Sequence, residues 1–294
     1  MIEYVDAKTI VNKANTVGWF EYDYGMNIYR GCHHGCIYCD SRSDVYEVVD
    51  FDKVKPKRDA INIIEKELRS KRNKGIIGTG AMSDPYNKLE EKLQLTRQAL
   101  ELIDKYGFGV TITTKSSLVL RDIDILQRIA KHSPVIIKIT ITCFDDDLTK
   151  KIEPNVCSSS QRFAAVKKLR EAGLYAGILL MPVLPYVSDS WQNIQAILQK
   201  ATEVDASFIF AGFGVTQRTG QRAYYLNKLR EIDEQAYHNH LRDFGNIYSC
   251  RANNAKGLYA KYQKYCKEHN LTYKMKDIVN EYKSGYRNEQ ISLF

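Results

Sequence analysis

Three cysteines, Cys32, Cys36 and Cys39, lie within a segment of eight residues. The CxxxCxxC spacing allows three thiolates to bind three irons of a 4Fe-4S cluster and leaves the fourth iron without a protein ligand. Structural iron-sulfur and zinc sites usually have four protein ligands, so the missing fourth cysteine indicates that a small molecule completes the coordination. The alternative is a zinc ion that also binds His33 or His34, although zinc sites more often combine two separated ligand pairs.

The rest of the chain predicts the elements that position this loop. Short apolar or β-branched runs alternate with amphipathic helical patterns. Because strand-helix-strand units form right-handed crossovers, this order predicts a parallel sheet, open or closed into a barrel, followed by a helical C-terminal part. The predicted strands cover residues 27–29, 75–78, 110–114, 135–142, 175–181 and 207–213, and the predicted helices cover residues 58–69, 88–105, 121–130, 161–172, 189–202, 221–235 and 254–268.

The composition is that of a globular α/β protein of one or two domains, with 294 residues of which 44% are hydrophobic. The sequence shows no run of about 18 apolar residues and no signal-peptide pattern, so we expect a soluble cytoplasmic protein without membrane contact. The seven cysteines are odd in number and mostly dispersed, which favours reduced thiols. The net charge of +8 favours a polyanionic partner such as nucleic acid, although lysine-rich solvated helix faces would give the same charge.

Polar residues follow the second and third predicted strands, and the carboxyl ends of parallel strands are where functional groups gather. Gly80 lets the backbone approach a ligand closely, and Ser83 and Asp84 offer hydrogen-bonding groups beside it. A helix-capping turn would use the same two side chains. Lys115, at the end of the third strand, is costly to bury without an anionic partner, which a ligand carboxylate or phosphate would supply.

Lys138, Thr140 and Thr142 alternate along the fourth predicted strand and therefore share one face. An inward polar face is expected where a barrel is hollowed out for a ligand. A solvated sheet edge is the alternative.

The cysteine loop, with Tyr38 before its third cysteine, resembles that of the radical S-adenosylmethionine (SAM) superfamily. Within this superfamily, further segments of the chain resemble the spore photoproduct lyase-like branch, which is also called the DNA repair photolyase-like branch. The resemblance implies a partial (β/α)6 TIM-like barrel, which we expect at residues 26–215, between an N-terminal extension (1–25) and a closing helical segment (216–285) with a tail (286–294). The segments that resemble this branch are NIYRGCHHGCIYCDSRS at 27–43, SDPY at 83–86, TKS at 114–116, EP at 153–154 with Arg162, GILLMPVLPYVSD at 177–189 and GQRAYYLNKL at 220–229.

The resemblance implies a 4Fe-4S cluster and SAM as cofactors, and an electron donor such as flavodoxin or ferredoxin. It implies reductive cleavage of SAM to a 5′-deoxyadenosyl radical that abstracts hydrogen from a DNA lesion. Asp40, Ser41 and Arg42 depart from the branch's pattern after the third cysteine, so a related lesion or a modified base fits as well as the spore lesion. RNA or a peptide is the alternative substrate, and a non-catalytic, metal-containing nucleic-acid-binding protein is the second alternative.

The candidate site residues extend beyond the three cysteines. Cys143, at the tip of the fourth strand, is the candidate hydrogen donor, and a small buried side chain is the alternative. Aromatic residues near the barrel mouth, Tyr86, Tyr186, Tyr224 and Tyr225, are candidates for stacking an extruded base. The candidate SAM-binding residues implied by the resemblance are Tyr38, Gly80, Ser83, Asp84, Lys115, Thr140, Thr142 and Arg162.

The chain ends in Gln290, Ile291, Ser292, Leu293 and Phe294. This segment resembles the peptide with which bacterial DNA repair and replication proteins bind the sliding clamp, whose apolar anchors fill a pocket on the clamp. A tail that folds back on the barrel is the alternative.

Overall fold

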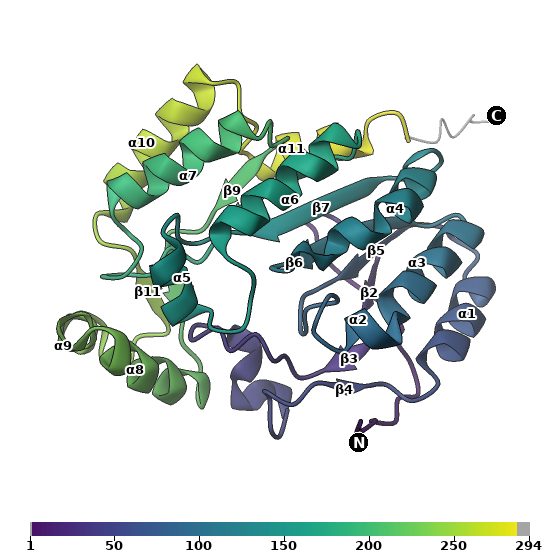
Figure 1. Cartoon of the computed structure of the whole chain (residues 1–294), viewed down its shortest axis with the longest axis horizontal. Coiled ribbons are helices and arrows are strands. Elements are labelled where there is room, and N and C mark those ends of the chain that lie inside the picture. Colours follow the sequence, from purple (N-terminus) through teal and green to yellow (C-terminus); the bar gives the residue numbers. More distant parts are fainter. Residues whose placement is uncertain (1, 287–294) are drawn as a thin grey trace.

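The computed structural model describes residues 2–286 and is built on one seven-stranded sheet with the order β1-β2-β5-β6-β7-β8-β9 (Figure 1). β1 pairs antiparallel with β2, and each later neighbouring pair is parallel. The edge strands β1 and β9 do not pair with each other, so the sheet forms a partial barrel, as predicted. The strands are β1 (Val11–Lys13), β2 (Tyr24–Met26), β5 (Ile76–Thr79), β6 (Gly109–Thr114), β7 (Val135–Thr140), β8 (Ala176–Leu180) and β9 (Ile209–Ala211).

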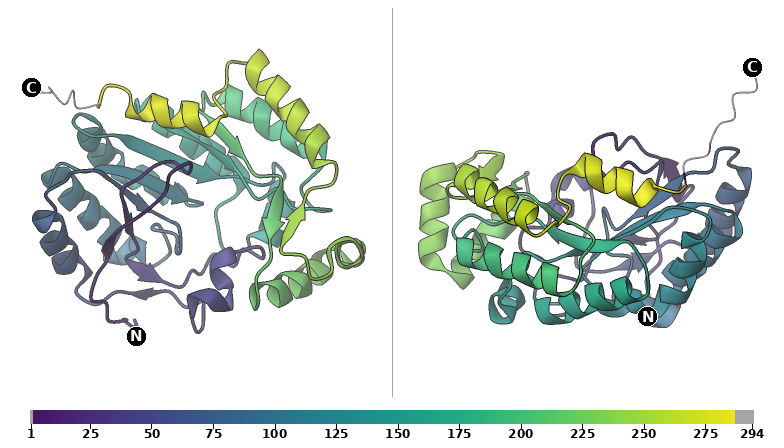
Figure 2. Two further views of the ribbon diagram at one scale, coloured as in Figure 1. Left: turned by 180° about the vertical axis from the view of Figure 1, so that it is seen from behind. Right: turned by 90° about the horizontal axis from the view of Figure 1, so that it is seen from above.

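The helices between these strands lie on the outside of the curved sheet (Figures 1 and 2). Buried residues recur along these helices at the spacing expected of an amphipathic helix. The apolar faces that they form pack in the core. α4, for example, buries Ile125, Leu126 and Ile129 and packs against β6 and β7. These helices are α1 (Ala60–Ser70), α2 (Glu90–Leu93), α3 (Leu95–Lys105), α4 (Ile123–Ala130), α5 (Asp146–Ile152), α6 (Ser159–Glu171) and α7 (Trp191–Glu203).

The first parallel strand lies three residues earlier than predicted, at Tyr24–Met26 instead of 27–29. Ile28 and Tyr29 are buried, but they pack in the core beside the sheet. Tyr29–Arg30 forms the short strand β3, which pairs antiparallel with β4 (Lys55–Pro56). The assignment of residues 27–29 to the main sheet was therefore wrong.

After β9 the chain forms a helical C-terminal part, as predicted. β10 (Gly214–Thr216) pairs antiparallel with β11 (Ser249–Arg251), and α8 (Gln221–Ile232) and α9 (Glu234–Phe244) lie between them in sequence. The predicted helix 221–235 is divided at Asp233, whose side chain accepts a hydrogen bond from the Ala236 N–H and caps α9. α10 (Ala255–Glu268) packs against α7.

The last described helix, α11 (Met275–Lys283), covers the amino ends of the strands. We call Phe20, Phe208, Ile278, Val279 and Tyr282 the aromatic floor, since they pack together beneath the barrel interior. The Tyr282 hydroxyl donates a hydrogen bond to the Phe20 carbonyl oxygen at 2.6 Å. The floor therefore joins the N-terminal extension to the C-terminal helix.

Within residues 2–286, no helix has the length and apolar character needed to cross a membrane. All seven cysteines are free thiols, as predicted. The segment that resembles a clamp-binding peptide, 290–294, lies outside the described residues.

Candidate active site

The cysteine loop is held by backbone contacts on both sides. The Cys32 N–H donates to the Phe51 carbonyl at 2.7 Å, and the Ile37 N–H donates to the Ile152 carbonyl at 3.0 Å. Gly35 has φ of +69°, and a Cβ there would lie 2.9 Å from Pro154 Cγ, so a side chain at this position would push the loop away from its neighbour. The loop is thus fixed against the segment between α5 and α6.

The thiols of Cys32, Cys36 and Cys39 line one small cavity of about 100 Å³, which Lys115 also lines. Burial raises the pKa of the Cys32 thiol to about 11 and the pKa of the Cys36 thiol well above its ordinary value. Among the described residues, no three His, Cys, Asp or Glu side chains converge tightly enough to hold one metal ion. Three free thiols around one cavity, with the half-buried Lys115 ammonium beside them, are a donor set that fits a thiolate-bound cluster.

His34 also lines this small cavity, and its side chain contacts the Asp84 carboxylate. Its Nδ1 lies 3.6 Å from the Asp84 carboxylate, and burial lowers the pKa of His34 to about 4. The imidazole is therefore neutral near pH 7.

Ser83 and Asp84 line the small cavity and tie three loops together. The Ser83 hydroxyl donates to the Gly31 carbonyl at 2.5 Å. The Asp84 carboxylate accepts hydrogen bonds from the Thr114 hydroxyl at 2.7 Å and from the Lys115 N–H at 2.8 Å. Neither side chain caps a helix. Their bonds hold the cysteine loop, the loop after β5 and the end of β6 in one arrangement.

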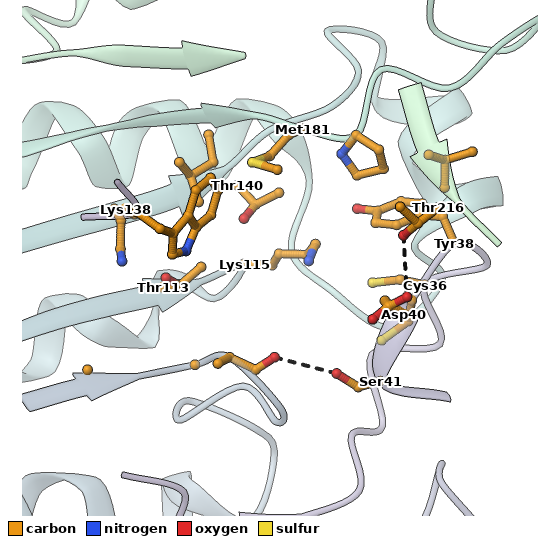
Figure 3. A pocket seen from close by; sticks show the side chains of 18 of the residues that line it. Cys36, Tyr38, Asp40, Ser41, Thr113, Lys115, Lys138, Thr140, Met181 and Thr216 are labelled. Carbon is orange, nitrogen blue, oxygen red and sulfur yellow. Dashed lines mark hydrogen bonds between the residues drawn. The ribbon is translucent and has the colours of Figure 1, made fainter. Parts of the chain in front are cut away.

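A larger cavity of about 420 Å³ extends from the cysteine loop into the barrel (Figure 3). Four of the predicted SAM-binding residues, Tyr38, Gly80, Lys115 and Thr140, line it. Gly80 has φ of +93°, and a Cβ there would lie 1.9 Å from the Thr113 carbonyl oxygen, so glycine is required for this close approach to β6.

Lys115 lies between the two cavities and lines both. Although burial acts to lower it, the pKa of Lys115 is held above its ordinary value, first by the Cys36 sulfur and then by the Glu153 carboxylate. Its Nζ is 5.6 Å from the centroid of the Tyr38 ring. A half-buried ammonium next to the cysteine loop can bind a ligand carboxylate.

Arg162 does not line either cavity. It is fully buried, and its guanidinium donates to Glu153 Oε2 at 2.5 Å, to the Thr140 carbonyl at 2.8 Å and to the Cys157 carbonyl at 3.1 Å. The Tyr38 hydroxyl donates to the other oxygen of Glu153. Although burial acts to raise it, the charge of Arg162 holds the pKa of Glu153 below its ordinary value. Arg162 therefore positions Glu153 and Tyr38, and the structure does not bring it to the predicted SAM site.

Thr142 and Cys143 are likewise absent from the linings of both cavities. Cys143 is 1% exposed, packs in a core cluster with Leu184 and Tyr225, and has a pKa that burial raises to about 12. This packing agrees with the alternative of a small buried side chain. The four tyrosines named for base stacking do not line the larger cavity either.

Several cavity residues were not identified as site residues from the sequence. Trp19 and Tyr22 come from the N-terminal extension, and Lys138 and Met181 come from β7 and from the end of β8. The alternation of Lys138 with Thr140 was the one signal that pointed to this interior face.

A model of the radical SAM superfamily matches residues 26–198, which is more than half of the chain, and the protein therefore belongs to this superfamily. Membership implies a 4Fe-4S cluster and SAM as cofactors. The chain is 26% identical to an uncharacterised protein of Mycobacterium tuberculosis over 227 residues, which cover 74% of the chain and 66% of that protein. It is 34% identical to an uncharacterised protein of Methanocaldococcus jannaschii over 170 residues, which cover 56% of the chain and 62% of that protein. The matches thus span less than two thirds of these relatives.

Among solved structures, a variant of spore photoproduct lyase shares the fold with a TM-score of 0.65 and 14% identity, covering 92% of this chain and 80% of that one. A spore photoproduct lyase variant with bound SAM and dinucleoside spore photoproduct gives a TM-score of 0.60 and 16% identity, covering 86% and 76%. A radical SAM methyltransferase from Kitasatospora setae gives 0.55 and 10%, covering 82% and 51%.

Proposed function

We propose that this radical SAM enzyme acts on nucleic acid, with a DNA lesion as the foremost substrate. The observation that carries the radical SAM chemistry of the proposal is the convergence of Cys36, Cys39, Lys115 and Thr140 on one cavity that continues into the barrel. When bound, the cluster and SAM supply a 5′-deoxyadenosyl radical, and the continuing cavity offers room for a substrate group beside it.

The chain's own residues bind and orient. The Lys115 ammonium would pair with the SAM carboxylate, and Thr140 lines the same cavity. Gly80 opens the backbone for close contact, while Ser83 and Asp84 keep the surrounding loops in place. Hydrogen donation by Cys143 would require a change of structure, because its side chain lies in the core.

Nucleic acid is favoured by the net charge of +8 and by the fold shared with spore photoproduct lyase. RNA or a peptide is the alternative substrate. The shared fold alone does not separate these, since a methyltransferase solved with a tryptophan substrate and a peptide-bound protein have the same core.

The test begins with anaerobic reconstitution. We expect four irons and four sulfides per chain, and 5′-deoxyadenosine on reduction with SAM. Cys36→Ala should fail to assemble an intact 4Fe-4S cluster and should form no 5′-deoxyadenosine, whereas Cys266→Ala, a change in the buried face of α10, should retain both the cluster and the product. One zinc per chain and no SAM cleavage would contradict the proposal.

The substrate class is tested with uniformly deuterated, irradiated DNA. Deuterium in 5′-deoxyadenosine would support a DNA substrate, because the radical takes hydrogen from the molecule it attacks. Label transfer from deuterated RNA or a peptide, with none from DNA, would assign that molecule as the substrate class in place of DNA. A flavodoxin or ferredoxin should replace the chemical reductant.

The segment 290–294 extends the proposal to a partner. We propose that it binds a bacterial sliding clamp, as the likeness of its sequence suggests. Deletion of 290–294 should abolish retention on an immobilised clamp and leave SAM cleavage unchanged. If the truncated chain were retained on the clamp as well as the full chain, segment 290–294 would not be the clamp-binding peptide.

A further inference from the structure

Lys138 lies at the end of the larger cavity opposite the cysteine loop (Figure 3). It is 3% exposed, and its Nζ lies 4.3 Å from the centroid of the Phe20 ring in the aromatic floor. Within residues 2–286 the Lys138 side chain makes this ring contact but no hydrogen bond and no ion pair.

A buried ammonium without an anionic partner is costly, and burial lowers the pKa of Lys138 to about 7. The other titratable groups that line the cavity do not shift this pKa. The carboxylate among them, Asp40, accepts a hydrogen bond from Arg218 at 2.9 Å instead. The remaining titratable groups of the lining are Tyr22, Tyr38, Lys115, Cys36 and Cys39.

Two aromatic side chains lie at the Lys138 end. The Trp19 ring is 5.1 Å from the Phe20 ring, centroid to centroid, and Trp19 lines the cavity. Tyr22 lines it as well and packs against the cluster that contains Phe20, and a Cβ at Gly78 would lie 2.6 Å from the Tyr22 ring. Aromatic walls next to an unpaired amine form a site for a flat ring with a polar substituent.

We propose that Lys138, Trp19 and Tyr22 form the substrate-recognition end of the cavity, where a planar ring packs against the two aromatic side chains and the Lys138 amine donates a hydrogen bond to a ring carbonyl oxygen. The ligand class is an oxo-substituted heterocycle, of which thymine and uracil are the nucleic-acid members. The inference deepens the proposed function and rests on it for the position of the substrate beside SAM.

The first test labels the amine directly in the reconstituted, SAM-bound full chain. At pH 7 about half of an amine with a pKa near 7 is neutral and reactive, compared with less than about 0.1% of an ordinary lysine. Formaldehyde and cyanoborohydride should therefore methylate Lys138 well before Lys168, an exposed residue on the outer face of α6. Peptide mass spectrometry measures both rates.

Three pyrimidine probes are then added: thymidine, irradiated oligothymidylate and oligouridylate. We expect at least one of them to slow methylation of Lys138 about tenfold, and SAM alone to leave the rate unchanged. Protection by any one of the three probes would support the inference, and protection by oligouridylate alone would count against a DNA substrate. Protection by SAM alone, or by none of the three probes, would overturn the inference, while SAM cleavage would still report separately on the proposed function.

The second test is the pH dependence of binding. The affinity for the protecting probe should fall about tenfold per pH unit above pH 7, until the pKa of the amine in the complex is reached. Lys138→Met should bind the probe about tenfold more weakly and lose this pH dependence, and Lys168→Met should match the unaltered protein. Retention of the pH dependence in Lys138→Met would assign it to another group and overturn the inference.

Discussion

Replacement of Arg162 by methionine distinguishes support of the cysteine loop from direct contact with SAM. Arg162 and Glu153 are both fully buried, and the guanidinium uses three nitrogens to bind Glu153 and the carbonyls of Thr140 and Cys157. Methionine has a similar length but no donors. It would leave the Glu153 carboxylate buried with the Tyr38 hydroxyl as its remaining hydrogen-bond partner and with Lys115 as the remaining positive charge that acts on it.

The expected loss of unfolding free energy is about 3 to 5 kcal/mol, the usual result of removing one partner of a buried ion pair. The Tyr38 hydroxyl bond should keep the loss near the lower end of this range. In the double variant Arg162→Met with Glu153→Gln, no charge remains unpaired, so its loss should be smaller than the sum of the two single losses.

The assay is anaerobic urea unfolding, followed by circular dichroism, with SAM affinity measured in parallel. Lys167→Met is the matched control, because Lys167 lies on the same helix and pairs with Glu171, and both side chains are 61% exposed. This control should lose no more than about 1 kcal/mol. An Arg162→Met variant with unchanged stability and tenfold weaker SAM binding would refute the positioning role and place the guanidinium on SAM.

Three further predictions concern other parts of the cavity. Lys115→Met should weaken SAM binding about tenfold or more in equilibrium dialysis, since it removes a charge-assisted hydrogen bond, and unchanged binding would exclude the contact. Gly80→Ala should lose SAM binding because its Cβ would lie 1.9 Å from the Thr113 carbonyl, whereas Gly173→Ala, which has a similar φ and nothing within 4 Å, should keep it. The unfolding free energy of the unaltered protein relative to Lys138→Met should rise between about pH 7 and pH 10, by up to about 4 kcal/mol, because the unfolded lysine binds a proton that the folded one has released. Urea unfolding at pH 7 and 9.5 measures this difference, and equal values would contradict the lowered pKa.

The order of strands and helices could be predicted because each element carries its own periodic pattern. The cysteine spacing that predicts a cluster is likewise complete within eight residues, and Gly80, Lys115 and Thr140 lie at the ends of strands. These features are local in sequence, so the structure confirms the partial barrel and brings these residues to one cavity.

The remaining features depend on contacts between distant segments. Arg162 has the charge expected of a residue that binds the SAM carboxylate. Its partner Glu153 appears in the sequence only as part of a motif, and nothing there predicts that the guanidinium pairs with it. Trp19 and Tyr22 lie in an extension without a motif, and they reach the cavity because Phe20 packs in the floor with α11. No periodic pattern within residues 1–25 predicts the packing of Phe20 against α11.

The aromatic floor also affects how the chain folds during its synthesis. The parallel strands are complete once residue 211 has been made, but Phe20 gains its partner Tyr282 only when α11 emerges from the ribosome about seventy residues later. Until then the underside of the nascent barrel remains open to solvent around Lys138. Completion of the interior therefore follows formation of the sheet and depends on contact between the segment around Phe20 and α11.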